Sequence, residues 1–172
     1  MSNKVDQPEC STRVLDCREI EEFVRIMKKS PGFASYSVKE LQSYNTAQRI
    51  ISIVLSGKVC GIAAYKNINK DWTEFTTLVM HKDFRGKGLG KKLWQAMLEK
   101  LATKNILAIS ANPLVKNNLA LADGFVSQNF WQLTGVVQRY LIIQRLRPSK
   151  IIGALRQSDV KIREFEFFVK MR

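Results

Sequence analysis

The stretch HKDFRGKGLGKKL runs from His81 to Leu93 and decides the fold. Its glycines alternate at positions 86, 88 and 90, with cations at positions 85, 87, 91 and 92. A run rich in β-branched residues, TEFTTLVMH (73–81), precedes it and predicts a strand. A helical stripe follows, formed by Leu89, Leu93, Met97, Leu98 and Leu101. A strand, a glycine-rich loop and a helix N-terminus together predict a phosphate site, because the first helical amides have no intrahelical partner.

Two familiar phosphate loops do not fit this spacing. A Walker loop needs GxxxxGK followed by Ser or Thr, whereas GKGLGKK has other gaps and no hydroxyl. The dinucleotide fingerprint is GxGxxG after a first strand, whereas this loop is GxGxG and follows the third predicted strand.

The segments before the loop predict two helices and a hairpin. Residues 17–28 place apolar side chains at helical spacing, and the Pro31-Gly32 pair ends that helix. A capping box from Ser37 to Glu40 opens a second helix that runs to about Tyr44. RIISIVLS (49–56) and VCGIAAY (59–65) flank Gly57-Lys58 and predict a hairpin.

The segments after the loop predict a buried strand at ILAIS (106–110) and a helix from Asn112-Pro113 to Asp123-Gly124. FVSQNFWQL (125–133) and VVQRYLIIQRL (136–146) then predict two more strands, joined at Thr134-Gly135. This order of helices and strands predicts an α/β fold with a mixed sheet. We expect four aromatic side chains in the core or in a pocket wall: Trp72, Phe125, Phe130 and Trp131.

LVMHKDFRGKGLGKKL (78–93) resembles the acyl-CoA-binding motif of the GNAT superfamily of N-acetyltransferases. The family signature, R/Q-x-x-G-x-G/A between a strand and a long helix, is met by Arg85, Gly88 and Gly90. Gly86 and Leu93 are residues that the family often has at these positions. The Gly124-Phe125 pair, which ends the next predicted helix, also matches the family pattern. The resemblance covers residues 12–146 and implies the GNAT fold, a mixed central β-sheet flanked by helices.

The resemblance also implies how the chain binds acetyl-CoA. Backbone groups of Leu78, Val79 and Met80 would pair with the pantetheine arm in the manner of an added strand. Asn112 resembles an asparagine that often contacts the cofactor, although it lies one residue further from Gly124-Phe125 than is usual. The pyrophosphate would be held by the loop amides and one lysine: Arg85, Gly86, Lys87, Gly88, Leu89, Gly90 and Lys91.

In this family an amine attacks the thioester directly, and a glutamate on the motif strand is often the general base. Glu74 lies six residues before Met80 and matches that role; the alternative is a strand-edge carboxylate that faces water. The usual thiolate-protonating tyrosine is absent, because its position is Ala120. Tyr140 or Tyr65 could replace it, or water could suffice. The same gap leaves open a protein that binds acyl-CoA without catalysis.

Composition limits the partners. The net charge of +13 favours anionic or phosphorylated partners and argues against polyamine and aminoglycoside substrates. The acceptor is then a small amine, an amino acid or a peptide amine. Three cysteines with no CxxC pair and one histidine favour reduced thiols and no metal site. No run approaches the ~20 apolar residues of a membrane span, and no signal peptide is apparent, so we expect a cytoplasmic protein.

Residues 1–147 form the expected acetyltransferase domain, which ends before Pro148, and residues 148–172 form a basic C-terminal extension. The extension predicts a short helix and then a strand, VKIREFEFFV (160–169). We expect it to extend the sheet or to make a homodimer contact. A basic module for nucleic acid or another polyanion is the competing function, although no recognition-helix or zinc-finger pattern supports it.

Overall fold

The structure, a computed structural model, describes residues 8–30, 36–110, 115–117, 124–145 and 166–172. Its sheet has seven strands in the order β1-β2-β3-β4-β5-β7-β6. The β4–β5 pair is parallel, whereas β1–β2, β2–β3, β5–β7 and β6–β7 are antiparallel. The predicted mixed α/β fold is therefore confirmed. The strands are β1 (Glu9–Ser11), β2 (Ile50–Leu55), β3 (Lys58–Asn67), β4 (Trp72–Met80), β5 (Asn105–Ser110), β6 (Phe125–Gln128) and β7 (Glu166–Lys170).

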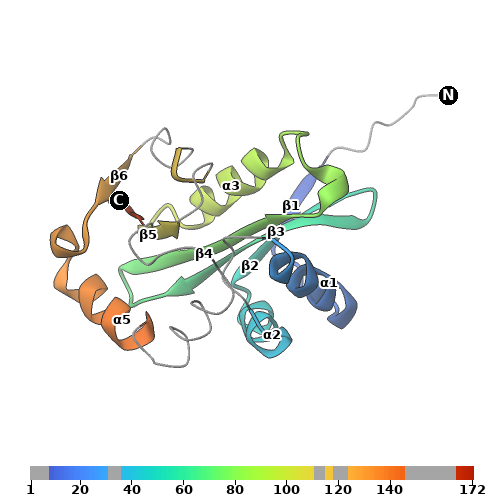
Figure 1. Cartoon of the computed structure of the whole chain (residues 1–172). Coiled ribbons are helices and arrows are strands. Elements are labelled where there is room, and N and C mark those ends of the chain that lie inside the picture. The colour runs from blue at the N-terminus through green and yellow to red at the C-terminus, as the bar shows by residue number, and fades with distance from the viewer. Residues whose placement is uncertain (1–7, 31–35, 111–114, 118–123, 146–165) are drawn as a thin grey trace. The chain divides into compact units, whose positions relative to one another are not determined.

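The chain forms two compact units, and β4 contributes residues to both. The first unit holds Met1–Ser30, Ser35–Tyr65 and Thr76–Lys100. Within it, α1 (Cys17–Lys28) and α2 (Val38–Thr46) cover one face of the strands, and α3 (Leu89–Lys100) covers the other (Figure 1). Both early helices begin at capping boxes, with Asp16 and Ser37 as N-caps.

The buried face of α1 consists of Ile20, Phe23, Val24 and Met27, all at most 3% exposed. This is the stripe that the sequence predicted, and its burial holds the helix on the sheet. The predicted hairpin is also confirmed, since β2 and β3 pair from Ile50↔Ala64 to Leu55↔Lys58. The short edge strand β1, which pairs with β2, was not predicted.

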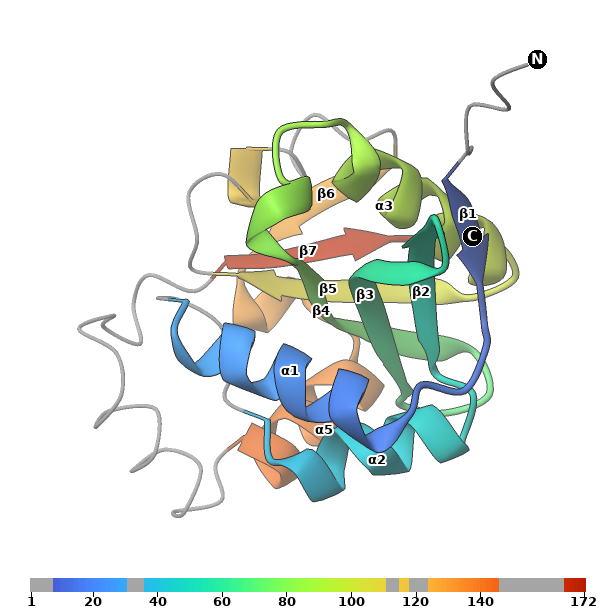
Figure 2. The same ribbon diagram turned by 90° about the vertical axis from the view of Figure 1, so that its right-hand side faces the viewer.

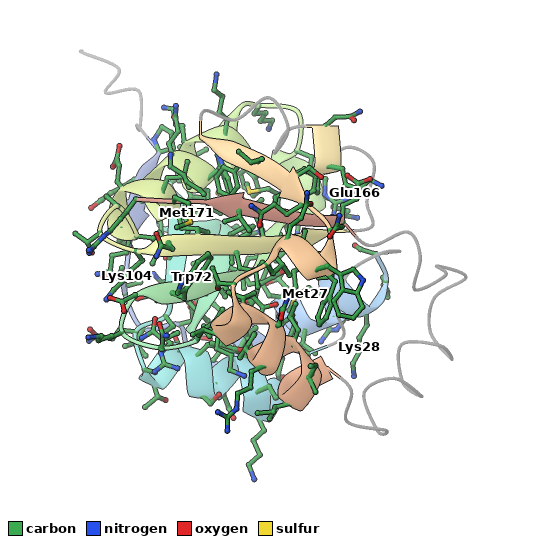
Figure 3. All side chains as sticks on the ribbon, turned by 90° about the vertical axis from the view of Figure 1, so that its left-hand side faces the viewer. Met27, Lys28, Trp72, Lys104, Glu166 and Met171 are labelled. Atoms are coloured by element: carbon green, nitrogen blue, oxygen red, sulfur yellow. The ribbon has the colours of Figure 1, made fainter. Side chains whose placement is uncertain are left out.

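The second unit holds residues 31–34, 66–75 and 101–172. Its sheet places β7 between β5 and β6 (Figure 2). Figure 3 labels Glu166 and Met171 near the two ends of β7. The pairing runs from Ile106↔Lys170 to Ser110↔Glu166 on one side, and from Phe125↔Lys170 to Gln128↔Phe167 on the other. The C-terminal extension thus supplies a strand, as predicted, but an interior one.

The predicted strand VVQRYLIIQRL (136–146) is wrong, because residues 136–145 form most of helix α5 (Gly135–Arg145). Val137 is fully buried and Leu141 is 5% exposed, whereas Val136, Ile142 and Ile143 are about half exposed. In a strand Val137, Arg139 and Leu141 would share one face, but Arg139 is exposed, so the burial pattern matches a helix. The β-branched composition suggested a strand, but packing of this face decided the structure.

The predicted strand FVSQNFWQL is correct only for its first four residues. Asn129 caps a 3-10 helix, η2 (Phe130–Gln132), by accepting from the amides of Trp131 and Gln132. Trp131 is 83% exposed, so its expected place in the core is wrong. Trp72 and Phe125 are buried, as expected.

Several predictions fall outside the described residues. They are the break at Pro31-Gly32, most of the helix predicted from Asn112 to Asp123, and the extension up to Phe165. No described helix has the length and apolar character that a membrane crossing requires. Within the same ranges, no group of His, Cys, Asp and Glu side chains has a metal-binding arrangement.

Candidate functional site

The glycine-rich loop connects the end of β4 to the start of α3. After Met80 and His81, a 3-10 turn, η1 (Lys82–Phe84), leads into Arg85. Gly86 and Gly88 follow with φ of +75° and +74°, a region that side chains with a Cβ rarely adopt. The carbonyl of Gly88 accepts from the amides of Lys91 at 3.1 Å and Lys92 at 3.3 Å. These bonds start α3 and leave its first amides pointing away from the helix.

The glycines keep the backbone of the loop open. A Cβ on Gly86 or Gly88 would meet no heavy atom within 4 Å. On Gly90 it would meet only side-chain carbons in ordinary contact, the nearest being Cγ of Met80 at 3.7 Å. Leu89 between them is 6% exposed and anchors the loop in the core. Leu89 therefore fixes the loop to the core, while the glycines leave its backbone uncovered by side chains. This arrangement suits the close approach of a phosphate.

Two contacts tie the start of the loop to the sheet. Nε of Arg85 donates to the carbonyl of Met80 at 3.1 Å, and the amide of His81 donates to the carbonyl of Cys60 at 2.8 Å. The His81 ring also bridges Glu22 on α1, at 3.0 Å, and Asp83, at 3.3 Å. The amide of Arg85 donates to the carbonyl of Lys82 at 3.3 Å, so both its side chain and its amide bind protein backbone here.

Positive charge gathers around Phe84 in this loop. Nζ of Lys87 lies 5.4 Å from the centroid of the Phe84 ring, and Nζ of Lys58, the first residue of β3, lies at 5.8 Å. The exposed side chains of Lys87, Lys91 and Lys92 add further charge beside the first turn of α3. The helix dipole and these cations favour the same kind of ligand, an anion.

Strand β4 carries both the loop and Glu74. Its parallel ladder with β5 joins four pairs, from Trp72↔Asn105 to Phe75↔Ala108. Among the described residues, that ladder stops before Leu78, Val79 and Met80. Parallel pairing uses backbone groups along one edge of a strand, so an added extended chain could pair there.

Glu74 is buried and not a strand-edge carboxylate that faces water. It is 4% exposed, opposite Leu107 on β5, and no other acid among the described residues is buried. The hydroxyl of Tyr140 on α5 donates a hydrogen bond to Oε2 of Glu74. Burying a carboxylate is expensive without such a partner, so this bond compensates part of the cost.

The Tyr140 side chain is set by packing on both sides. It packs against a cluster whose buried members are Trp72, Leu107, Leu133, Val137, Leu141 and Val169. Nζ of Lys66 at the end of β3 lies 5.3 Å from the Tyr140 ring centroid. Sequence reasoning did not single out Lys66, since no spacing rule connects β3 to α5.

Two residues proposed from the sequence for thiolate protonation have different outcomes. Tyr140 contacts Glu74, although it lies on a helix and not on the predicted last strand. The Tyr65 hydroxyl instead donates to the carbonyl of Gln48 at 3.5 Å. Asn112 and Ala120 lie outside the described residues.

Comparison with solved structures finds the same fold in acetyltransferases. N-acetylglutamate synthase from Neisseria gonorrhoeae, complexed with coenzyme A and N-acetyl-glutamate, is 14% identical with a TM-score of 0.66, over 95% of this chain and 35% of that one. Rv2747 from Mycobacterium tuberculosis, in complex with CoA and a second ligand, is 16% identical with a TM-score of 0.66, over 95% and 99%. The ribosomal-protein-S18-alanine N-acetyltransferase from Escherichia coli is 19% identical with a TM-score of 0.56, over 72% and 80%.

The chain thus spans about a third of the gonococcal synthase and nearly all of Rv2747. A search of curated proteins found no match. The model of the acetyltransferase (GNAT) family matches residues 17–123, from the first residue of α1 to the position before Gly124. This match covers more than half of the chain, and the strand–loop–helix that carries the motif lies within it, so the protein belongs to the GNAT family of acetyltransferases.

Proposed function

We propose that the protein is an acetyl-CoA-dependent N-acetyltransferase that acts on a primary amine by direct attack in a ternary complex. One observation carries the proposal. Strand β4 holds a buried glutamate, Glu74, in a hydrogen bond with Tyr140, and the strand ends six residues later at Met80 and leads through η1 into the bare glycine loop. A base and an anion-binding loop on one strand are the two parts that this reaction needs.

The loop residues fit acetyl-CoA. We assign the pyrophosphate to the loop from Arg85 to Gly90 together with Lys91, because glycine leaves room and the helix terminus is positive. We assign the pantetheine arm to the backbone of Leu78, Val79 and Met80, past the end of the β4–β5 ladder. Asn112 stays a prediction from the sequence. When bound, acetyl-CoA supplies an activated acetyl group as a thioester.

The chain itself has to deprotonate the amine and hold it in line. Glu74 accepts the proton that the amine loses as nitrogen bonds to the acetyl carbon and the thiolate leaves. Tyr140 fixes one carboxylate oxygen of Glu74 by its hydroxyl hydrogen bond. A tyrosine in this position could also return a proton to the leaving thiolate, with Glu74 replacing the proton it gives. The described geometry supports the orienting role directly.

The acceptor is a small amine, an amino acid or a peptide amine. The N-acetyl-glutamate in the gonococcal complex makes free amino acids the first compounds to assay. The net charge of +13 favours acceptors that carry negative charge over polyamines. A cytoplasmic location and a homodimer stay predictions from the sequence.

Titration calorimetry with acetyl-CoA, followed by an assay of CoA release with an amine panel, tests the proposal. We expect micromolar binding, and Glu74→Gln should lower turnover by about 100-fold or more while binding stays intact. Binding without turnover on any amine would favour an acyl-CoA-binding protein. No binding of CoA, together with salt-dependent oligonucleotide binding, would favour the polyanion module.

A further inference from the structure

Two lysine side chains meet at one aromatic ring beside the glycine-rich loop. Nζ of Lys58 on β3 lies 5.8 Å from the centroid of the Phe84 ring, and Nζ of Lys87 lies 5.4 Å from the same centroid. All three residues belong to the first unit. A cation this close to a ring is attracted by its face, so Phe84 gathers two ammonium groups that would otherwise repel each other.

The carboxylates beside this cluster already have partners. On α1, Glu19 is paired with Arg13, and Glu22 lies 3.0 Å from the His81 ring. Asp83 of η1 contacts the same ring at 3.3 Å. Within the ranges that the structure describes, no carboxylate forms an ion pair with either lysine of the cluster. The cluster therefore carries a local excess of positive charge.

Both lysines have room to reach a ligand. Lys58 lines a cavity of about 360 Å³, and the side chain of Lys87 is exposed. An anion could pair with both ammonium groups without breaking an ion pair of the described residues. Glu19 and Glu22 line the same cavity and would repel an anion on the α1 side, so it would bind on the Phe84 side.

We propose that the side chains of Lys58 and Lys87 bind the 3′-phosphate of CoA, so that the protein selects CoA over dephospho-CoA. The inference rests on the proposed function and adds a part of the cofactor that the same site recognises. The 3′-phosphate lies on the ribose whose 5′ carbon carries the pyrophosphate, so a pyrophosphate on the loop brings it within one sugar of the loop. As a phosphate monoester it carries about −1.5 to −2 charges at pH 7.

Other roles for Lys58 make different predictions. If its ammonium contacted the pyrophosphate, its loss would weaken binding of CoA and dephospho-CoA alike, because both carry that group. If it acted only through the net charge near the loop, removal of another lysine of this region would have the same effect. If it binds the 3′-phosphate, its loss weakens binding of CoA alone.

Titration calorimetry measures the affinity of the protein for CoA and for dephospho-CoA, which lacks only the 3′-phosphate. The variants are Lys58→Gln, Lys58→Arg and the double variant Lys58→Gln/Lys87→Gln. Lys82→Gln is the matched control, because Lys82 is exposed at the start of η1 and lies outside the cluster. The affinity of each variant for dephospho-CoA also reports whether its loop is intact.

We expect the wild type to bind CoA about fivefold or more tightly than dephospho-CoA at low salt, since two exposed ion pairs together contribute on this order. Lys58→Gln should lower the affinity for CoA and leave that for dephospho-CoA unchanged. The double variant should bind the two ligands alike, whereas Lys58→Arg and Lys82→Gln should keep the wild-type ratio. Added salt should shrink the ratio, because Lys58 and Lys87 are exposed.

The proposal would be overturned by equal affinity of the wild type for the two ligands, or by an unchanged ratio in Lys58→Gln. An equal fall of the ratio in Lys82→Gln would also overturn it. In each of these cases CoA still binds, so the proposed function stands and only the role of the two lysines is wrong. A protein that binds neither ligand and acetylates no amine would refute the function itself and this inference with it.

Discussion

The hydroxyl of Tyr140 on α5 donates a hydrogen bond to Oε2 of Glu74 on β4, across 66 residues of sequence. The helix brings the phenol to the strand through Val137 and Leu141, which are buried on the same side of α5. Glu74 is therefore held by a donor that neither its own strand nor the loop provides. A base in a fixed orientation loses less entropy when it accepts a proton from a bound amine.

Replacing Tyr140 by Phe should reduce kcat by about 10-fold to 100-fold, because a hydrogen bond to a charged group contributes about 1.5–3 kcal/mol. The ring and its contact with Lys66 would be kept. If Tyr140 acts through Glu74, the Glu74→Gln/Tyr140→Phe double variant should be no slower than Glu74→Gln alone. Steady-state assays of the four proteins test this, and fully multiplicative losses would show that the two residues act independently.

Gly90→Glu should abolish acetyl-CoA binding, because its carboxylate would occupy the space through which a phosphate approaches the backbone. Gly90→Ala, which the family signature accepts at this position, is the matched control and should retain binding. The fold should not suffer, since the new Cβ would lie 3.7 Å from Cγ of Met80, an ordinary contact, and alanine favours the helix. Calorimetry for affinity and urea unfolding for stability measure the two effects separately.

Gly57, outside the loop, serves as the control for Gly88 within it. Gly57 in the β2–β3 turn has φ of +75°, like Gly88 at +74°, and open space around it. Alanine at either position should lower the free energy of unfolding by about 1 kcal/mol through backbone strain. Only Gly88→Ala should also weaken acetyl-CoA binding, and an equal loss of affinity in Gly57→Ala would contradict the site.

Gly61→Ala should destabilise the fold by about 1–3 kcal/mol through overpacking. A Cβ on Gly61 would lie 2.8 Å from Cε of Met80 and 2.9 Å from the backbone oxygen of Val79, and the backbone cannot move aside cheaply. Gly135→Ala is the comparison, because nothing lies within 4 Å of its Cβ. Urea midpoints of the two variants should differ clearly, and similar midpoints would show that β3 and β4 can separate.

Phe168→Ala in β7 should lower the free energy of unfolding by about 3–5 kcal/mol, the usual range for a buried phenylalanine. Phe168 is 1% exposed, whereas Met171, just past the same strand, is 59% exposed. Met171→Ala should therefore stay within about 0.5 kcal/mol of wild type. Thermal unfolding of both variants tests whether the C-terminal extension is integral to the sheet.

Burial raises the pKa of the Cys60 and Cys10 thiols above the usual 9.0, despite opposing lysines nearby. Both stay protonated at neutral pH, so alkylation, which needs the thiolate, should be slow at both. Cys17 is exposed and should react first. Mass spectrometry after brief iodoacetamide treatment should find one label, which Cys17→Ser removes. Two or more fast labels would contradict the structure.

The sign of the stability effect follows from these raised pKa values. The folded state favours the protonated thiols, so their contribution to the free energy of unfolding is complete below the usual pKa of 9.0. It is lost as the pH rises through the higher folded-state pKa.

The sequence predicted the first unit well because its signals are local. The capping box at Ser37 marks a helix start within four residues, and the positive φ angles at positions 86 and 88 require glycine there. The second unit depends on contacts that are distant in sequence. Whether residues 136–145 become a strand or a helix is decided by burial of Val137 and Leu141 against Leu107 and Val169.

The candidate site shows the same division. Glu74 and the loop follow from motif spacing along one strand, and Tyr140 could be proposed only as one of two tyrosines. What distinguishes Tyr140 from Tyr65 is the packing of α5, which no local pattern contains. Lys66 was missed for the same reason, since its contact with Tyr140 joins the last residues of β3 to α5.

The interior position of β7 constrains the order in which this half of the sheet can assemble. Strands β5 and β6 are synthesised before β7, and they do not pair with each other. Each pairs instead with β7, which lies about forty to sixty residues further along the chain. Until that segment arrives, both strands expose an unpaired edge, which invites pairing with other chains. The contacts of β7 are also long-range, and such contacts slow folding. Nascent or truncated forms that lack residues 166–170 should therefore be the aggregation-prone species of this protein.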